Sequence, residues 1–314
     1  MSSPALSVAT QPTTGNVKQI ERIDNPSEEY FRQNYVEKGI PVVITGSKPR
    51  LPQWDWQFDN LKRLAGDCLI PVYDWGDSGP TVQDNFMIKE MKFADAIKQA
   101  TAVTRTTEQR FAVCQLPIES LPPLAERYQV PSFLKNATKL DHLPIPFGET
   151  PRCALFISFF RGIHFHNGRE AVAQLLTGHK KFTLYHPKDS RYLYPRKPGM
   201  AWFDETEAVF CSEIPFEEGL DAIDREKFPL LDRATRYEVD LKAGESLYIP
   251  SHWWHFTSAY EPSAVIVEFW DAPLRRWGYP IAWRSLIMKP YRRYLYWHLL
   301  KLRAFSRNQQ VLEK

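Results

Sequence analysis

The amino-acid sequence predicts a mainly β protein, a barrel or sandwich of short strands behind a mixed α/β N-terminal part. From Cys153 onward, short apolar segments alternate with turn residues, which is typical of barrels and sandwiches. The chain also contains 25 prolines against 14 glycines, which favours many short elements over long helices. With 314 residues, of which 43% are hydrophobic, it is long enough to bury a sizeable core.

Helices and strands are both expected in the N-terminal part. Ser27 is the expected N-cap of the first helix, because an Asn-Pro pair precedes it and two glutamates follow it. Tyr30, Phe31 and Tyr35 would form the apolar face of this helix, and Gly39 would end it. The later elements expected here are a strand at 41–44, a helix at 60–65, a strand at 69–75, a helix at 91–100, a strand at 111–115 and a proline-broken helical connection at 119–134.

The β part carries most of the expected strands and sets the domain boundaries. Apolar segments with strand spacing lie at 153–160, 170–176, 180–187, 235–241, 245–250 and 263–270. Residues 1–16 are polar and are interpreted as a disordered leader. One domain is therefore expected at 17–271, followed by an extension at 272–314.

That C-terminal extension is basic and aromatic. Between residues 272 and 310 there are nine basic residues and no acidic one, and part of the segment has helical spacing. It is expected to be helical and to pack on the barrel or on a second copy of the chain, which makes a homodimer possible. A membrane-surface helix and a nucleic-acid patch are the alternatives.

The net charge and the cysteine content indicate no particular class of binding partner. The net charge is only +3, which provides no general argument for nucleic acid, and no apolar run approaches the ~20 residues that cross a bilayer. The four cysteines show no CxxC spacing, so they are interpreted as reduced thiols in a cytoplasmic protein.

Two histidines stand one residue apart in the segment 162–182. If this segment is a strand, His164 and His166 point to the same face and reach one point in space. Such a pair suggests a metal site. Because two ligands rarely hold a metal alone, a third is expected elsewhere, and His255 is the best candidate.

These segments resemble the JmjC, or cupin-8-like, Fe(II)- and 2-oxoglutarate-dependent oxygenases. The similarity covers roughly 17–271 and is carried by YVEKGIPVVITG, RFAVCQLPIESLPPL, GIHFH with AQLLTGHKKFTLYHP, and above all GESLYIPSHWWHF. It implies a double-stranded β-helix, a jelly roll of the cupin type. It also implies that His164 and His255 are metal ligands, and that His252 is a neighbour of the site or a surface residue.

His166 departs from this family, which has an aspartate or glutamate two residues after the first histidine. Three-histidine sites bind Fe(II), Zn(II) and Cu(II), so His166 can still serve as a ligand. The resemblance also implies that Lys180 pairs with the distal carboxylate of 2-oxoglutarate, while Lys181 points to the opposite face of the strand.

Other expected contacts with the cosubstrate are altered. Arg161 stands where many relatives have a threonine, and Phe111 where some have a tyrosine. Gln174 matches a polar position near the cosubstrate, and Glu268 stands where some relatives have an asparagine. A buried glutamate requires a partner, and we expect Arg161 and Glu268 to form an ion pair at the rim of the pocket.

The leading functional prediction is a non-haem oxygenase that hydroxylates a C–H bond with Fe(II), O₂ and 2-oxoglutarate. One alternative is a three-histidine metal oxygenase that does not use 2-oxoglutarate. The other is a non-catalytic binding protein with the same fold. The substrate stays open among a protein side chain, an RNA and a small molecule.

Overall fold

A computed structural model gives the structure of the protein, and it describes eleven stretches of the chain. These are residues 16–47, 56–74, 76, 87–102, 111–135, 153–157, 161–166, 169–195, 209–216, 219–259 and 261–272. The leader expected at 1–16 lies outside them except for Asn16, and so do the C-terminal helices expected after residue 272. Homodimer formation through those helices therefore stays a prediction.

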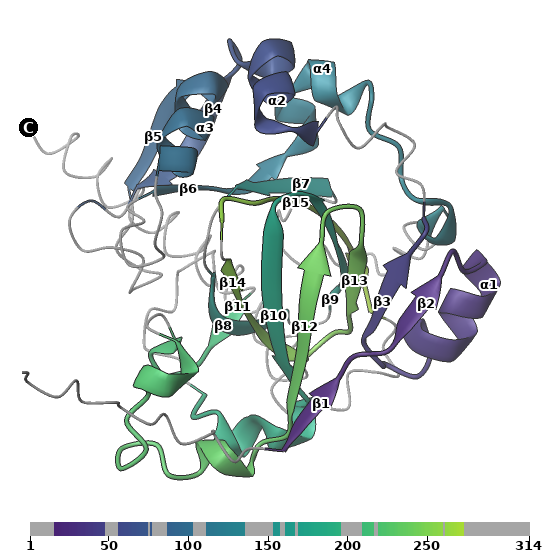
Figure 1. The fold of residues 1–314 in the computed structure, drawn as a ribbon, viewed down its shortest axis with the longest axis vertical. Coiled ribbons are helices and arrows are strands. Elements are labelled where there is room, and N and C mark those ends of the chain that lie inside the picture. Colours follow the sequence, from purple (N-terminus) through teal and green to yellow (C-terminus); the bar gives the residue numbers. More distant parts are fainter. Residues whose placement is uncertain are drawn as a thin grey trace, which may run out of the picture.

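Two sheets face each other and form a jelly roll (Figure 1). The minor sheet has the order β1 (Val17–Gln19), β12 (Arg236–Lys242), β10 (His179–Tyr185), β14 (Trp254–Ala259), β8 (Arg161–His166), β11 (Val209–Cys211). The major sheet has the order β2 (Arg22–Asp24), β3 (Val42–Thr45), β13 (Ser246–Ile249), β9 (Arg169–Thr177), β15 (Ala264–Asp271), β7 (Cys153–Ile157), β6 (Phe111–Pro117), β4 (Leu69–Asp74), β5 (Met87–Lys92).

The chain crosses repeatedly between the two sheets. From β8 to β9 to β10, and again from β12 through β13 and β14 to β15, it moves from one sheet to the other. Only the pairs β1–β12 and β2–β3 are parallel among the described pairings. This winding is a double-stranded β-helix, so the predicted fold class is confirmed.

An apolar core lies between the two sheets. Inward positions alternate with outward ones along each strand, and the inward set of the minor sheet includes Phe182, Leu184, Val239 and Leu241. The facing wall of the major sheet is lined by Ala171, Ala173, Leu175, Leu247, Val265, Val267 and Phe269. The inward side of the major sheet is therefore almost wholly apolar in the described residues.

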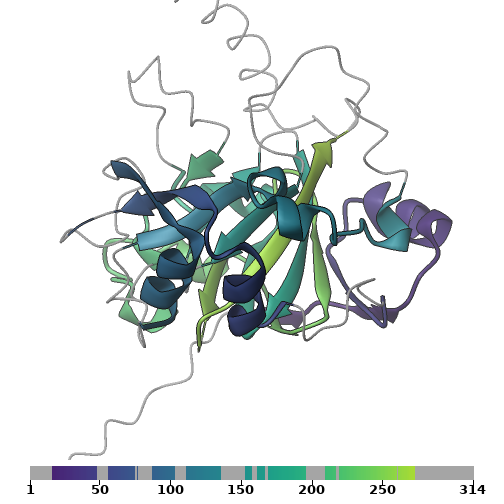
Figure 2. The same cartoon turned by 90° about the horizontal axis from the view of Figure 1, so that it is seen from above.

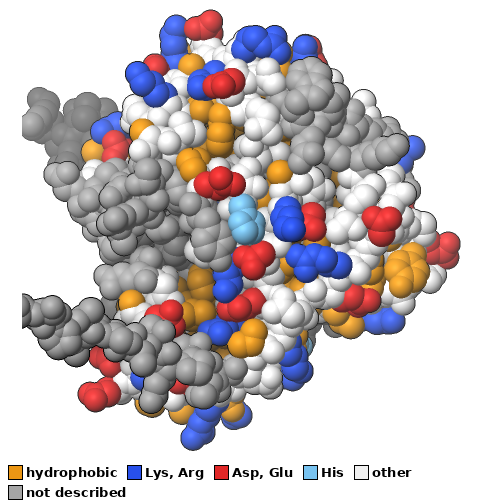
Figure 3. All heavy atoms as spheres, in the orientation of Figure 1, with side chains coloured by type: hydrophobic (Ala, Val, Ile, Leu, Met, Phe, Trp, Pro, Cys, Tyr) orange, Lys and Arg blue, Asp and Glu red, His pale blue; other side chains and the backbone are white. Residues whose placement is uncertain are grey.

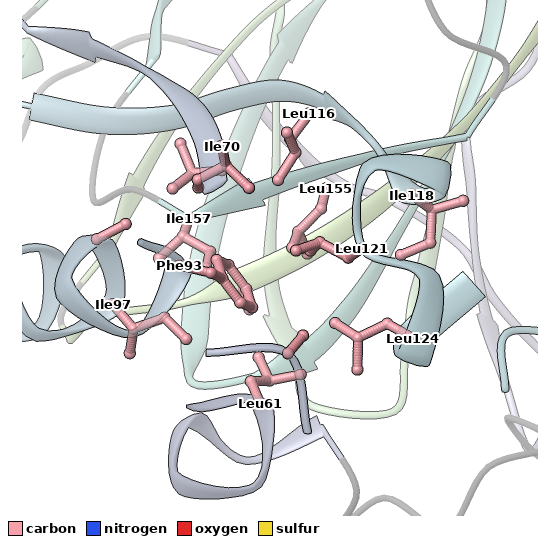
Figure 4. Packing of buried hydrophobic residues seen from close by; sticks show 14 of the residues in the cluster. Leu61, Ile70, Phe93, Ile97, Leu116, Ile118, Leu121, Leu124, Leu155 and Ile157 are labelled. Carbon is pink, nitrogen blue, oxygen red and sulfur yellow. The ribbon is translucent and has the colours of Figure 1, made fainter. Parts of the chain in front are cut away.

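Helices and loops cover the outer faces of both sheets. On the major sheet, α2 (Phe58–Ala65), α3 (Phe93–Ala102) and α4 (Pro122–Ala125) bury a second apolar cluster (Figures 2 and 4). Further along that sheet, α1 (Glu28–Phe31) packs on β3 and β13. The outer face of the minor sheet is covered by the segment between β10 and β12.

The N-terminal elements follow the prediction closely, with two corrections. Ser27 caps α1 by accepting a hydrogen bond from the Tyr30 amide at 3.2 Å, as expected. The expectation that Tyr30 lies on the apolar face is wrong, because its side chain is 49% exposed. The helix predicted from Met91 begins at Phe93, because Met91 and the residue after it end strand β5 in a hairpin with β4.

Three further features concern the surface charge, the helices and the cysteines. The face seen in Figure 3 mixes Lys and Arg with Asp and Glu rather than gathering one sign. No helix in the described part of the chain has both the length and the apolar character needed to span a bilayer. All four cysteines are free thiols, as expected.

Candidate metal centre

Three histidines converge inside the jelly roll. His164 and His166 project from β8 and His255 from the neighbouring strand β14, where His255 is the direct cross-strand partner of His164. One nitrogen of each imidazole lies within 4.8 Å of the others. The ring centroids of His164 and His255 are 4.2 Å apart, those of His166 and His255 4.7 Å, and those of His164 and His166 5.3 Å.

The donor set fits a transition-metal ion. Imidazole nitrogens bind such ions at about 2.0–2.1 Å, so nitrogens that share one ion lie roughly 3 Å apart. Nitrogens that lie within 4.8 Å of one another need to approach by at most about 2 Å to share an ion. His164 and His255 are almost fully buried, and imidazole suits iron, zinc and copper alike. These three residues could hold the metal that the sequence predicts.

A backbone contact orients the ring of His255. Its Nδ1 lies 3.0 Å from the carbonyl oxygen of Trp253. Since a carbonyl only accepts, Nδ1 carries the hydrogen, and the lone pair of His255 is on Nε2. Metal-binding histidines are commonly held by such a bond to the second ring nitrogen, which fixes tautomer and orientation.

His252 supports the site without belonging to the triad. It has a left-handed backbone with φ of 67°, and its amide donates to the carbonyl of His166 at 3.1 Å. Its Nδ1 is 2.9 Å from the Ser251 hydroxyl. Burial lowers the pKa of His252 to about 4, so the ring is neutral near pH 7. The sequence left open whether His252 is a neighbour of the site or a surface residue, and the structure places it, buried, beside the site.

The two lysines of β10 lie on opposite faces, as predicted. Lys181 points outward and forms an ion pair with Glu238 at 3.1 Å. Lys180 is paired with Leu241 of the inner core, so it points into the jelly roll, where it is 4% exposed. Its Nζ lies 3.4 Å from the hydroxyl of Ser263.

Three residues predicted to contact a cosubstrate lie on the other side of the major sheet. Phe111 packs in the outer cluster under α2 and α3. Gln174 is the cross-strand partner of Ile266, another member of that outer cluster. Glu268 alternates with the inward residue Phe269 and so points outward. The prediction that these three residues line the cosubstrate pocket is therefore wrong.

Gln174 and Glu268 instead join a buried polar network on the outer face. The Tyr128 hydroxyl donates to Glu268 at 2.6 Å and accepts from the Gln174 amide at 2.6 Å. Burial raises the pKa of Glu268, while hydrogen bonds from Tyr128 and Cys153 oppose this rise. Burial also raises the pKa of Tyr128 well above its usual value.

The predicted ion pair between Arg161 and Glu268 involves a side chain outside the described residues, that of Arg161, and so stays a prediction; Glu268 itself points to the outer face and accepts a hydrogen bond from Tyr128. The backbone of Arg161 belongs to β8 of the minor sheet, and its side chain lies outside the described atoms. Arg161 on β8 is paired with Thr257 on β14. The register of these two strands shifts between this pair and the pair His164–His255.

Two inward residues near the triad were missed. Thr257 stands two positions after His255 on β14 and points to the same side. Cys211 is the cross-strand partner of His164 on β11, so it shares that face. The spacing after His255 could have indicated Thr257, whereas nothing in the sequence pairs Cys211 with β8.

Comparison with known proteins points to one family. The profile of the family described as "Cupin-like domain" matches residues 27–273. Over 271 residues the chain is 24% identical to mouse (Mus musculus) "tRNA wybutosine-synthesizing protein 5", covering 80% of this chain and 77% of that protein. It is 26% identical over 278 residues to "Lysine-specific demethylase 8" of Danio rerio, covering 83% of this chain but only 61% of the relative.

A third relative, "JmjC domain-containing protein D" of Dictyostelium discoideum, is 26% identical over 266 residues, which is 78% of this chain and 55% of that protein. The chain thus spans little more than half of the length of some of its relatives. The match concerns the jelly roll that carries the three histidines.

Proposed function

The chain belongs to the cupin-like (JmjC-like) oxygenase family, and from this membership we propose that it is a non-haem Fe(II)- and 2-oxoglutarate-dependent oxygenase that hydroxylates a C–H bond. The observation that carries the proposal is the convergence of His164, His166 and His255 within 4.8 Å on the inner wall of the minor sheet. A buried lysine on that same wall supports it.

Each of these residues has a definite task in the proposed site. His164, His166 and His255 would hold iron, with the Trp253 carbonyl fixing the ring of His255. Lys180 would neutralise the far carboxylate of 2-oxoglutarate from inside the jelly roll. When bound, the iron would activate O₂, which is the oxidant, and 2-oxoglutarate would supply two of the electrons that reduce it, so that one oxygen atom can enter an unactivated C–H bond.

The apolar wall of the major sheet complements these polar groups. Ala171, Ala173, Val267 and Phe269 face the interior from that sheet, and Phe269 packs edge-on against the ring of His166 with centroids 5.2 Å apart. Such a wall excludes water from the neighbourhood of the histidines and lowers the local dielectric, which strengthens the attraction of anions to the site.

The histidine at position 166 changes the charge of the proposed centre. A divalent ion held by three neutral imidazoles keeps its full charge, whereas a carboxylate ligand would cancel one unit. A more positive centre favours anionic co-ligands and lowers the pKa of bound water further. Both effects support binding of a 2-oxo acid through its negatively charged end.

Anaerobic titration of the Fe(II)-loaded protein with 2-oxoglutarate tests the proposal. The bidentate complex of Fe(II) with this ligand gives a weak visible charge-transfer band, which we expect to appear and saturate. Lys180→Met should weaken the titration at least about tenfold, because it removes the charge that meets the far carboxylate. Lys181→Met is the matched control, since Lys181 points outward to Glu238, and should titrate like wild type.

Absence of the band from protein with bound iron would overturn the use of 2-oxoglutarate. Absence of bound metal would leave the non-catalytic binding protein. If Lys181→Met weakens the titration as much as Lys180→Met does, the interior lysine has no special role.

A three-histidine oxygenase that does not use 2-oxoglutarate is the second candidate. It is favoured by the outward positions of Phe111, Gln174 and Glu268, which leave fewer groups for the cosubstrate than the sequence predicts. In that case the substrate itself would bind the metal. The His166→Asp variant separates the two. A carboxylate ligand lowers the charge of the centre, so it should weaken 2-oxoglutarate binding in the first case, whereas in the second neither wild type nor the variant should bind 2-oxoglutarate.

The substrate class is open within the proposed function. One relative is named for tRNA wybutosine synthesis and another for lysine demethylation, so the names of relatives point to an RNA and to a protein side chain. A protein side chain, an RNA and a small molecule all stay possible. Incubation of the iron-loaded protein with each class, followed by mass spectrometry for a gain of one oxygen, tests this part.

A further inference from the structure

One buried hydroxyl on the inner wall has no partner in the described part of the chain. Thr257 is 6% exposed, and its Oγ1 makes no hydrogen bond to any described residue. A buried hydroxyl that forms no hydrogen bond costs free energy. The position is therefore explained best if a ligand bound in the interior supplies the missing partner.

Thr257 lies between the histidine triad and Lys180. It follows His255 by two positions on β14, so the two side chains share a face about 6.6 Å apart along the strand. On the neighbouring strand β10, Thr257 pairs with Phe182 and Lys180 pairs with Ala259. Lys180 and Thr257 are therefore diagonal neighbours on the inward face, a spacing that a long side chain bridges.

The hydroxyl of Ser263 is a third polar group in this region, next to Lys180. Ser263 is fully buried before β15, and its hydroxyl lies 3.4 Å from the Lys180 ammonium. The approach depends on Gly178 with φ of 84°, because a Cβ there would lie 2.4 Å from the carbonyl oxygen of Pro262 and 3.0 Å from Cα of Ser263. The missing side chain of Gly178 is what lets this segment close beside Lys180.

These groups have the chemistry of a carboxylate pocket. One ammonium and two hydroxyls are held in a region whose opposite wall is apolar, and all three can donate hydrogen bonds to an anion. The separation of Thr257 from His255 is on the order of the length of a short dicarboxylic acid. An acid of that length would reach from the triad to Lys180.

We propose that Thr257 is a specificity-determining residue, which donates a hydrogen bond from Oγ1 to the carboxylate that Lys180 neutralises and so selects dicarboxylic 2-oxo acids over monocarboxylic ones. This inference rests on the proposed function and assigns to Thr257 a role in binding the cosubstrate. Thr257 stands directly across from Arg161 on the neighbouring strand β8.

Calorimetric titration of the Mn(II)-loaded protein tests the proposal without any turnover. The two probes are 2-oxoglutarate and 2-oxobutyrate, which lacks the second carboxylate. Thr257→Val keeps the shape of the side chain and removes the hydroxyl, and it should weaken 2-oxoglutarate binding about tenfold while changing 2-oxobutyrate binding less than about twofold. Thr257→Ser keeps a hydroxyl and should stay within about threefold of wild type for both.

Thr183→Val is the matched control. Thr183 is also a buried threonine of the minor sheet, but it pairs with Phe256 of the outer cluster and so faces away from the interior. It should bind both acids like wild type. Circular dichroism and thermal unfolding of every variant establish that it is folded before it is titrated.

The outcomes separate this inference from the proposed function. If wild type binds 2-oxoglutarate and Thr257→Val binds it equally tightly, the role of Thr257 is refuted and the proposed function stands. An equal loss of both acids in Thr257→Val also refutes it, because the hydroxyl would then not select the second carboxylate. If the Mn(II)-loaded wild type binds no 2-oxoglutarate, both proposals fail.

Discussion

The carboxylate of Glu170 accepts a hydrogen bond from the backbone amide of Ser251 at 2.9 Å. The same oxygen accepts from the hydroxyl of Tyr248 at 2.7 Å, and Glu170 is fully buried. This contact ties the start of β9 to the turn that leads from β13 into the strand of His255. The position of one triad histidine thus depends on a carboxylate on the outward side of the major sheet.

Glu170→Ala should therefore weaken metal binding without touching the triad. Two buried donors lose their acceptor, which costs about 2–4 kcal/mol of unfolding free energy. The loosened turn should reduce Zn(II) affinity about tenfold, as is usual for groups that support metal ligands. Tyr248→Phe is the control, because it loses one side-chain hydrogen bond and leaves the Ser251 contact. Equal metal affinities of Glu170→Ala and wild type would contradict this coupling.

His166→Ala should abolish the stabilisation that metal provides. Wild type at a Zn(II) concentration a hundred times Kd should gain about 2.7 kcal/mol, seen as a rise in Tm. A site reduced to two histidines binds far more weakly, so the variant should show little rise. His179→Ala is the control, because His179 lies on β10 outside the triad, near Asp240 at 3.8 Å. A full rise in His166→Ala would mean that His166 is not a ligand.

Gly178→Ala should destabilise the protein more than Gly219→Ala does. Both glycines have positive φ, of 84° and 92°, so an alanine is strained at either place by about 1–3 kcal/mol. At Gly178 the added Cβ also meets the Pro262 carbonyl at 2.4 Å, whereas at Gly219 no atom of the described residues lies within 4 Å. We expect Gly178→Ala to cost about 1–3 kcal/mol more, measured by urea unfolding. Equal costs would show that the close contact relaxes freely.

Glu268→Gln should change the pH dependence of stability in an unusual direction. Burial holds the pKa of Glu268 above that of an unfolded chain, so the folded state keeps its proton to higher pH. By linkage, the contribution of Glu268 to stability is fully present at low pH and is lost as pH rises through the raised pKa. Glutamine does not titrate, and its amide oxygen can still accept from Tyr128.

Urea unfolding of wild type and Glu268→Gln between about pH 4 and 8 measures this effect, because the titration of other residues cancels in the difference. The stability of wild type relative to the variant should fall as pH rises. A relative stability that grows with pH would mean that Glu268 is a carboxylate stabilised in its charged form, and that burial does not dominate.

The histidine triad was predictable because part of it is local. His164 and His166 alternate along one strand, so their shared face follows from the period of two residues whatever the strand pairs with. His255 came from the motif that surrounds it, GESLYIPSHWWHF. The opposite faces of Lys180 and Lys181 follow from the same alternation.

The faces of Phe111, Gln174 and Glu268 were not predictable from alternation alone. The period of a strand says which residues share a face but not which face is inside, and a shift of one residue exchanges the two. Shifts of register occur on β6 and between β9 and β15. The partner that settles Glu268, the Tyr128 hydroxyl, is 140 residues away in the sequence.

The sequence by itself determined the shared face of the two histidines of β8 and the opposite faces of Lys180 and Lys181, since each depends on residues close together in the chain, and its resemblance to a known family gave the jelly roll. Only the tertiary structure decided which polar residues share the interior with the metal site. Pairing of β14 with β8 and β10 sets Thr257 between His255 and Lys180, and the inward position of Phe269 leaves Glu268 on the outer face, where it meets Tyr128. Such choices depend on register between distant strands, which no local pattern encodes.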